Sequence, residues 1–223
     1  MSAALPDLSL DEFRRRLVAA SPGPVAPRTL AALYAHYQEL RRWNPALSLV
    51  GPAAAGDVVE RHYAESLAGV PLVPAGARIL VDVGSGAGFP GFVLAAALPE
   101  LQVTLVEPRM RRWSFLLAAC RRAALSCRCL DARVERPLAP GLPERIDVVT
   151  TRALKLPVEA LGALAERLAP GGRVLVWAGE AEPEAPPGLV RSGETAIAGT
   201  RHRRIVELTP TTENQGYQDP RTC

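Results

Sequence analysis

The chain has 223 residues, of which 48% are hydrophobic and 22% are charged, so it can bury the core of one sizeable domain or of a domain with an added subdomain. This composition excludes a disordered chain, which is poorer in apolar residues and higher in net charge. The formal net charge of +3 comes from 25 arginines and a single lysine, Lys155. We interpret most of the arginine excess as the composition of a GC-rich genome, with a minority of the arginines placed to bind phosphate groups.

The sequence carries no signal for membrane insertion or export. It has no run of about 18 apolar residues, and Asp7, Asp11 and Glu12 interrupt the N-terminal stretch where a secretory signal would be apolar. The four cysteines form no C-x-x-C pair and have no histidine partners at zinc-finger spacing. We therefore expect a cytoplasmic protein with reduced thiols, no disulfide and no metal site.

Residues 1–75 are predicted to form an N-terminal helical cap. A helix is expected to begin at Pro27, and apolar residues recur at helical spacing after it: Leu30, Leu33, Tyr34, Tyr37 and Leu40. A loop rich in Pro, Gly and Ala is expected over 44–56, followed by a short helix that carries Arg61 and His62.

Residues 76–208 change to the pattern of an α/β domain, in which short apolar runs alternate with helical stretches around a parallel sheet. The tail 209–223 has almost no apolar residues and is expected to be disordered. A surface loop is expected over 180–188. The expected strands are 78–83, 103–106, 146–150, 173–177 and, more weakly, 205–208, and the expected helices lie near 91–98, 109–125 and 157–168.

The most informative segment is a glycine-rich loop after the first expected strand. That strand carries Asp82, and Gly84, Gly86, Gly88 and Gly91 then lead into a helix. Glycines let the backbone turn sharply and let a ligand approach the main chain, and the following helix presents unpaired N–H groups. The last three glycines also match the bare G-x-G-x-x-G pattern of nicotinamide dinucleotide loops.

Other features favour S-adenosylmethionine over a dinucleotide. A carboxylate at Asp82 would repel a pyrophosphate but can orient a cationic methionine group, directly or through water. Pro90 also departs from the dinucleotide pattern. The second expected strand ends at Glu107, which can accept hydrogen bonds from the ribose hydroxyls of either cofactor. The turn Pro170-Gly171-Gly172 is often seen in methyltransferases with such a loop. Together these features predict S-adenosylmethionine as the cofactor.

At these positions the sequence resembles the RsmG (GidB) family of methyltransferases, which modify N7 of a guanine in bacterial small-subunit ribosomal RNA. The resemblance covers about residues 30–178 and keeps the family's order and spacing. It rests on Trp43-Asn44, Arg61-His62 with Glu65-Ser66, Gly84 to Gly91, Arg112 to Leu116, Arg133-Val134-Glu135 and Asp147 to Ala153.

The resemblance implies a class I S-adenosylmethionine-dependent methyltransferase, a Rossmann-like α/β sheet with an N-terminal helical extension. It also implies roles for single residues. Gly84 and Phe89 would line the cofactor pocket, Glu107 would hold the ribose, Val134 and Glu135 would flank the adenine, and Arg152 would lie beside cofactor and target base. With Asp82, Gly86 and Gly88 from the glycine-rich loop, these residues form the expected cofactor site.

Arg152 and His62 are the expected catalytic residues. Guanine N7 has a free lone pair, so the transfer needs orientation rather than a general base. Arg152 would neutralise a phosphate or donate to guanine O6, and its alternative role is a structural ion pair with Asp147 or Glu135. His62, together with Arg61, would reach the pocket from the N-terminal helix, and its alternative is a satisfied structural histidine.

A cluster of positive charge predicts contact with RNA. Residues 105–136 carry eight arginines against three acids, a balance of +5. We expect Arg61, Arg111, Arg112 and Arg122 to contact phosphates of 16S ribosomal RNA or of the small ribosomal subunit, with a solvated polar face as the alternative. The protein is expected to act as a monomer. The helix over 109–125 is expected to bury a stripe of Met110, Trp113, Leu117, Cys120 and Ala124.

The chain departs from the family pattern in three places, which concern RNA contact rather than the cofactor. Its tail, 214–223, is nearly neutral, whereas the family commonly has a basic tail with aromatic residues. Ser48-Leu49-Val50 stands where the family has Asn-Leu-Thr, and Ala178 stands where it has lysine. The alternatives are a methyltransferase of this fold acting on another RNA site or a small molecule, and a non-catalytic RNA-binding relative. An NAD-dependent oxidoreductase is a further alternative, against which the lack of a Tyr-x-x-x-Lys pair stands.

Overall fold

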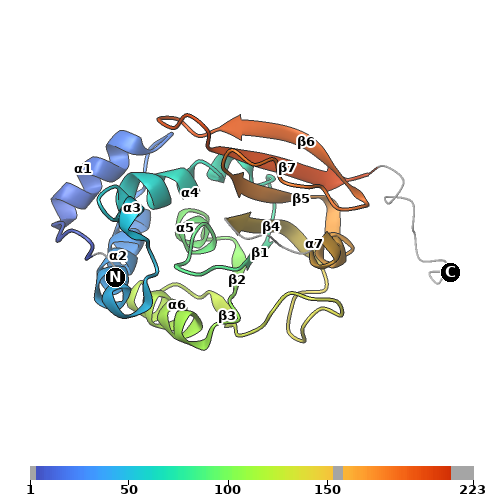
Figure 1. The fold of residues 1–223 in the computed structure, drawn as a ribbon, viewed down its shortest axis with the longest axis horizontal. Helices are drawn as coiled ribbons and strands as arrows, with labels where there is room; N and C mark the ends of the chain where they lie inside the picture. Colours follow the sequence, from blue (N-terminus) through green and yellow to red (C-terminus); the bar gives the residue numbers. More distant parts are fainter. Residues whose placement is uncertain (1–3, 153–157, 212–223) are drawn as a thin grey trace.

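The computed structural model describes residues 4–152 and 158–211, and a seven-stranded sheet forms its centre (Figure 1). The strand order is β3-β2-β1-β4-β5-β7-β6, in which β1 to β5 are parallel and β7 is antiparallel to both of its neighbours. The strands are β1 (Ile79–Val83), β2 (Gln102–Val106), β3 (Arg128–Leu130), β4 (Ile146–Arg152), β5 (Leu168–Ala178), β6 (Leu189–Ala196) and β7 (Arg204–Pro210). The predicted parallel α/β sheet is confirmed.

Helices cover both faces of the sheet. Because successive side chains along a strand point to opposite faces, the two faces contribute to two separate hydrophobic clusters. Leu80 belongs to the cluster beneath most of the helices, whereas its neighbour Val81 belongs to the cluster beneath α7 (Val158–Ala165). The remaining helices are α1 (Leu10–Ala20), α2 (Pro27–Leu47), α3 (Pro52–Ala55), the π-helical turn η1 (Val59–Ala64), α4 (Glu65–Leu67), the 3₁₀ turn η2 (Val70–Leu72), α5 (Gly91–Ala97) and α6 (Met110–Arg122).

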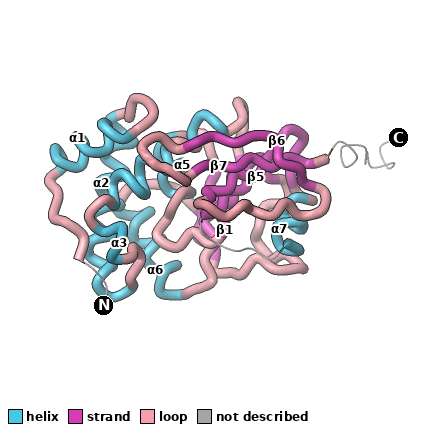
Figure 2. The backbone as a smooth tube through the Cα atoms, turned by 45° about the horizontal axis from the view of Figure 1, so that its top comes forward, coloured by secondary structure: helices cyan, strands magenta, loops and turns pink. Residues whose placement is uncertain are grey.

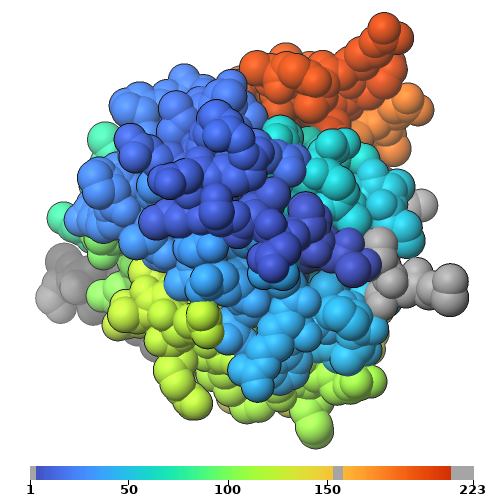
Figure 3. All heavy atoms as spheres, turned by 90° about the vertical axis from the view of Figure 1, so that its left-hand side faces the viewer, coloured from blue at the N-terminus to red at the C-terminus, as the bar shows by residue number. Residues whose placement is uncertain are grey.

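The N-terminal helices pack directly on the α/β part of the chain. An aromatic cluster of Phe13, Tyr37 and Tyr63 is fully buried, and the hydroxyl of Thr29 in α2 donates to the carbonyl of Ala96 at the end of α5 at 3.0 Å. Figure 2 shows these helices together at one end of the molecule and β5, β7 and β6 toward the other. Figure 3 shows that α1 and α2 form most of the surface at the helical end.

The expected elements agree with the structure except at several points. The helix does begin at Pro27, but the loop expected over 44–56 is partly wrong, because α2 continues to Leu47 and α3 forms within it. The side chain of Asn44 is fully buried and its Oδ1 accepts from the amide of Val50 at 2.7 Å, which stabilises the end of α2. Ser48 then ends the helix in the left-handed conformation, with φ of +48°.

The sequence did not predict β3 or β6, since β3 has three residues and the middle of β6 is polar and exposed. The start of the expected tail was also wrong, because β7 continues to Pro210, and residues 212–223 lie outside the described part of the chain. The predicted stripe of α6 is partly wrong, because Cys120 is buried but Met110 and Ala124 are exposed. Met110 is 69% exposed, and the buried residues of α6 are Phe115, Leu116, Ala119 and Cys120.

Within residues 4–152 and 158–211, no helix has both the length and the apolar character that a bilayer crossing requires.

Candidate active site

The glycine-rich loop between β1 and α5 packs tightly against neighbouring elements. The amide of Gly84 donates to the carbonyl of Val106 at 2.9 Å, which ties the loop to β2. Gly88 has φ of +87°, a conformation that glycine adopts without strain. A Cβ atom on Gly91 would lie 2.4 Å from the Cβ of Asp82. Glycine is therefore required at 88 by backbone conformation and at 91 by close packing on β1.

A cavity of about 570 Å³ opens at the carboxyl ends of β1, β2 and β4. The strand order reverses at this point, because β2 and β3 follow on one side of β1 whereas β4 and β5 lie on the other, and open α/β sheets bind ligands at such a point. Seven of the predicted cofactor residues line this cavity: Gly84, Gly86, Phe89, Glu107, Val134, Glu135 and Arg152. His62 and Arg112 line it as well.

Glu107 is a buried carboxylate at the wall of this cavity, with 2% of its surface exposed. Its Oε2 accepts from the amide of Gly86 at 3.0 Å and its Oε1 accepts from the amide of Arg109 at 2.9 Å. A carboxylate has about four acceptor positions, so each oxygen keeps one for a ligand. Val134, which is 4% exposed, adds an apolar surface to the same cavity.

Arg152 ends β4 and forms a buried ion pair with a helix of the N-terminal segment. Its Nη2 donates to Oε2 of Glu65 at 2.8 Å and to the carbonyl of Arg61 at 2.6 Å. Burial lowers the pKa of Arg152 to about 10, against the opposing effect of Glu65. Its Nη1 is buried and has no hydrogen-bond partner among the described residues. Arg152 therefore presents an unsatisfied donor at the cavity.

The structural ion pairs considered for Arg152 are both wrong. Asp147 accepts from the amides of Arg78 and Ile79 at 2.7 and 2.9 Å, at the opposite end of the sheet. Glu135 instead lies 3.4 Å from Arg133. The partner of Arg152 comes from the N-terminal segment, which strand periodicity does not locate.

His62 faces the cavity as a neutral ring. It stacks on Phe89, with ring centroids 5.0 Å apart and planes 19° from parallel. Burial lowers the pKa of His62 to about 3, and the positive charges of Arg152, Arg203 and Arg61 act in the same direction. Neither ring nitrogen has a hydrogen-bond partner among the described residues. The alternative of a satisfied structural histidine is therefore wrong.

Two predicted cofactor residues, Asp82 and Gly88, do not line the cavity. The side chain of Asp82 is fully buried, and its Oδ1 accepts from the hydroxyl of Thr150 on the neighbouring strand at 2.7 Å. Burial raises the pKa of Asp82 to about 6. Gly91 packs on this side chain and encloses it, so Asp82 is not placed for direct contact with a ligand in the cavity, and contact through water stays a prediction.

The four arginines predicted to contact RNA occupy different positions. Arg112 lines the cavity, Arg111 is exposed on α6, and Arg61 lines a neighbouring cavity. Arg122 instead pairs with Glu39 of α2 at 3.2 Å, so its guanidinium contributes to the packing of α6 on α2. The cluster expected from the sequence is therefore divided among separate locations.

The sequence reasoning missed His36 as a support of the glycine-rich loop. His36 is fully buried, and its Nε2 lies 2.9 Å from the carbonyl oxygen of Ala87. Its signal is a polar residue within the apolar helical pattern of Leu33, Tyr37 and Leu40, because such a residue is buried only with hydrogen-bond partners. It also missed Arg109 at the cavity wall.

Comparison with known sequences identifies the family. The GidB family model, rRNA small subunit methyltransferase G, matches residues 29–186. The Ribosomal RNA small subunit methyltransferase G of Rhodospirillum centenum is 43% identical over 150 residues, which cover 66% of each chain. The protein of the same name from Methylobacterium radiotolerans is 35% identical over 202 residues, which cover 90% of this chain and 89% of that one.

Solved structures support the fold. TrmN from Thermus thermophilus aligns with a TM-score of 0.54 at 21% identity, over 69% of this chain and 53% of that chain. A mutant of MtNAS in complex with S-adenosylmethionine aligns with a TM-score of 0.55 at 16% identity, over 90% of this chain and 77% of that chain. The predicted class I S-adenosylmethionine-dependent methyltransferase fold is confirmed. Because the family model matches residues 29–186 and a relative 35% identical covers 90% of the chain, the chain belongs to the rRNA small subunit methyltransferase G family.

Proposed function

We propose that this protein transfers a methyl group from S-adenosylmethionine to N7 of a guanine in 16S ribosomal RNA. The observation that carries the proposal is the cavity at the carboxyl ends of β1, β2 and β4. It is lined by His62 and Arg152, which have unsatisfied polar atoms, by the acceptor carboxylate of Glu107 and by the apolar ring of Phe89. The family to which the chain belongs supports the same reaction class.

The residues of the cavity fit S-adenosylmethionine. Glu107 keeps free acceptor positions for ribose hydroxyls, and Val134 offers an apolar surface to the adenine, with Glu135 beside it. Gly84 and Gly86 expose main chain at the cavity without a side chain in the way. When bound, S-adenosylmethionine supplies a methyl group on a positively charged sulfur.

The chain's own residues then orient the target base and exclude water. Because guanine N7 already has a lone pair, no side chain has to remove a proton from it. His62 is neutral at pH 7, so its ring and that of Phe89 form an uncharged wall. Arg152 holds its Nη1 donor at a fixed position, because its Nη2 donates to Glu65 and to the carbonyl of Arg61. Orientation of this kind is the main source of rate in a direct displacement.

Positive charge around the cavity suits an RNA substrate. Arg109, Arg112 and Arg133 all line it, and their charges attract a polyanion and speed its association. We propose that 16S ribosomal RNA, free or within the small subunit, is the partner, and that the protein acts on it as a monomer in the cytoplasm.

The test compares ribosomal RNA from a strain that lacks the gene with RNA from its parent, by digestion and mass mapping. The proposal expects one 7-methylguanine of 16S RNA to disappear and to return when the purified protein is added with S-adenosylmethionine. A methyl group lost at another RNA position would support the other-site alternative. If ribosomal RNA is unchanged, the substrate proposed is wrong. A thermal-shift comparison of S-adenosylmethionine, S-adenosylhomocysteine and NAD tests the cofactor separately, and stabilisation by NAD alone would contradict it.

A further inference from the structure

Three arginines meet around one carboxylate beside the active-site cavity. Glu65, which is 3% exposed, accepts from Nη2 of Arg152 at 2.8 Å. Both of its oxygens also accept from Nη1 of Arg203, at 2.6 and 2.7 Å. Arg61 is joined to the group through its carbonyl, which accepts from Arg152. These four side chains carry three positive charges and one negative charge.

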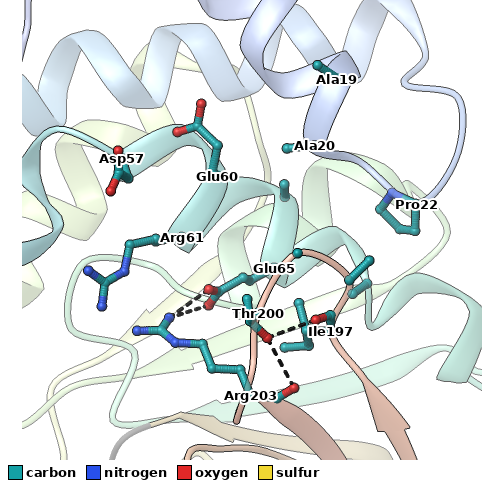
Figure 4. Close-up of a pocket in the computed structure, with 14 residues that line it drawn as sticks. Ala19, Ala20, Pro22, Asp57, Glu60, Arg61, Glu65, Ile197, Thr200 and Arg203 are labelled. Atoms are coloured by element: carbon teal, nitrogen blue, oxygen red, sulfur yellow. Dashed lines mark hydrogen bonds and ion pairs between the residues drawn. The ribbon is translucent and has the colours of Figure 1, made fainter.

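The cluster separates two cavities. Arg152 lines the cavity described above, whereas Arg61, Glu65 and Arg203 line a second cavity of about 500 Å³. This second cavity lies between the end of α1 and the β6–β7 connection, which contributes Thr200. Figure 4 shows the guanidinium groups of Arg61 and Arg203 turned toward the same side, with the carboxylate of Glu65 next to Arg203.

The other acids of the second cavity do not balance these charges. Glu60 forms an ion pair with Arg16 of α1 at 2.6 Å, and it points away from Arg203 in Figure 4. Asp57 is exposed and acts on the same Arg16, whose pKa it helps to raise. The positive charges around Glu65 are therefore in excess among the described residues.

The cluster also has unused hydrogen-bond donors. Nη1 of Arg61 donates to the carbonyl of Ala53 at 2.6 Å, and its Nη2 donates to no described residue. The same holds for Nη2 of Arg203. The charges of Arg203 and Arg61 help to lower the pKa of Arg152, which reflects repulsion that a bound anion would relieve.

We propose that Arg61 and Arg203 bind a phosphate group of the substrate RNA next to the target guanine. The proposal rests on the proposed function and adds the group by which the nucleotide is held. S-adenosylmethionine has no phosphate, so the cofactor does not supply this anion. The planar fork of arginine matches phosphate oxygens in pairs, and contacts to phosphate fix the register of a nucleic acid on a protein. Because the cluster lies between the two cavities, a phosphate bound in the second cavity would lie next to the active-site cavity, which His62 lines.

The experiment measures binding of a 16S RNA fragment as a function of salt, for the full chain and for Arg61→Gln, Arg203→Gln and Arg201→Gln. Arg201 is the matched control, because it is exposed on the same β6–β7 connection and does not line the second cavity. Loss of one phosphate contact lowers the slope of log K against log salt by about 0.7 to 0.9. We expect this change, with an affinity about tenfold weaker, for Arg61→Gln and Arg203→Gln, and a smaller one for Arg201→Gln.

Two further readouts separate a phosphate site from a structural role. In Arg203→Gln the Kd for S-adenosylmethionine should stay close to that of the unmodified chain, whereas the midpoint of thermal unfolding should fall, because Glu65 keeps only Arg152 as an ion-pair partner. The proposal is overturned if that variant loses cofactor affinity as strongly as RNA affinity, or if its salt slope matches that of Arg201→Gln.

Titration with inorganic pyrophosphate, followed by phosphorus NMR, tests the anion site without any methyl transfer. Saturable broadening that the Arg61→Gln/Arg203→Gln double variant abolishes supports the site even if no RNA is methylated, in which case the proposed function alone fails. Equal broadening in both proteins contradicts the anion site.

Discussion

Nε2 of His36 lies 2.9 Å from the carbonyl oxygen of Ala87, and Nδ1 of the same ring lies 2.7 Å from the hydroxyl of Tyr63. Burial lowers the pKa of His36 to about 3, so the ring is neutral at pH 7. A neutral imidazole has one donor and one acceptor. Because a carbonyl can only accept, Nε2–H donates to Ala87 and Nδ1 accepts from Tyr63. His36 of α2 thus links the glycine-rich loop, through Ala87, to Tyr63 of η1.

Replacing His36 with Phe should weaken both the fold and cofactor binding. The carbonyl of Ala87 and the hydroxyl of Tyr63 would be left buried and unpaired, at a cost of about 1–3 kcal/mol in the free energy of unfolding. The loop would lose a fixed point, so the Kd for S-adenosylmethionine should rise several-fold. Chemical denaturation and calorimetry measure the two effects.

Thr29→Val is the matched control for His36→Phe, because it removes a buried hydrogen bond from the same helix to Ala96, away from the loop. It should lower the stability and leave the Kd for the cofactor unchanged. Unchanged cofactor affinity in both variants would contradict a role of His36 in holding the loop.

Acidification should destabilise the protein between pH 6.5 and 3. His36 and His62 have folded pKa values of about 3 against a usual value of 6.5, so the unfolded chain binds protons in this range that the folded chain does not. Each histidine contributes a loss of about 1.4 kcal/mol at pH 5.5.

Asp82 acts in the opposite direction, since its raised pKa of about 6 lets the folded chain take up a proton that the unfolded carboxyl group does not bind until lower pH. The net fall in the free energy of unfolding should be about 2 kcal/mol on going from pH 7.5 to 5.5. Urea denaturation at both pH values measures it. His36→Gln should show a smaller fall than the unmodified chain, and an equal fall would refute the assignment.

Arg152→Ala should reduce methyl transfer far more than it reduces stability. Removal of a fixed donor at a reacting group costs about 100-fold to 1000-fold in rate. The loss of stability should be only about 1–2 kcal/mol, because Glu65 keeps its ion pair with Arg203. Single-turnover transfer and denaturation test the two parts.

Arg173→Ala provides the comparison for Arg152→Ala, since it breaks a similar ion pair, 2.8 Å to Glu207, between β5 and β7. It should lose stability and keep its rate of transfer. A proportional loss of rate and stability in Arg152→Ala would mean that its role is structural.

Glu107→Gln should weaken the binding of S-adenosylmethionine by about tenfold to 100-fold, because a hydrogen bond to a charged group contributes about 1.5–3 kcal/mol. The variant keeps the shape of the side chain but loses one acceptor oxygen. Asp147→Asn makes the same chemical change at the other end of the sheet, where the carboxylate accepts two backbone amides. Calorimetry should show weaker cofactor binding in the first variant alone, and equal affinities would exclude Glu107 as a ligand.

Much of the sheet and of the cavity could be predicted from the sequence because both depend on local patterns. The apolar runs of β1 and β4 and the glycines after β1 identify the strands and the loop. The carboxyl ends of parallel strands meet at one edge, so Glu107 and Arg152 were expected to lie near the same ligand, and both line the cavity. The short strand β3 and the polar strand β6 lack such a pattern.

Contacts between distant segments could not be predicted in this way. The pairing of Arg152 with Glu65 depends on how the N-terminal helices dock on the sheet, and no periodicity encodes that arrangement. The surroundings of the Asp82 side chain could not be predicted from the sequence either. Its position on β1 was clear, but whether it faced the cavity or the interior depended on the close approach of Gly91.

The pair formed by Glu65 and Arg203 joins residues that are 138 positions apart in the chain. Contacts of such long range form late in folding, because a large loop must close before they yield any stabilisation. During synthesis, the ribosome must therefore release nearly the whole described chain before the charged cluster can assemble. A nascent chain that has completed β1 to β4 contains the glycine-rich loop, Glu107 and Arg152, yet it lacks the last arginine of the cluster. We expect refolding experiments to recover methyl transfer only in the final kinetic phase, together with the pairing of β7.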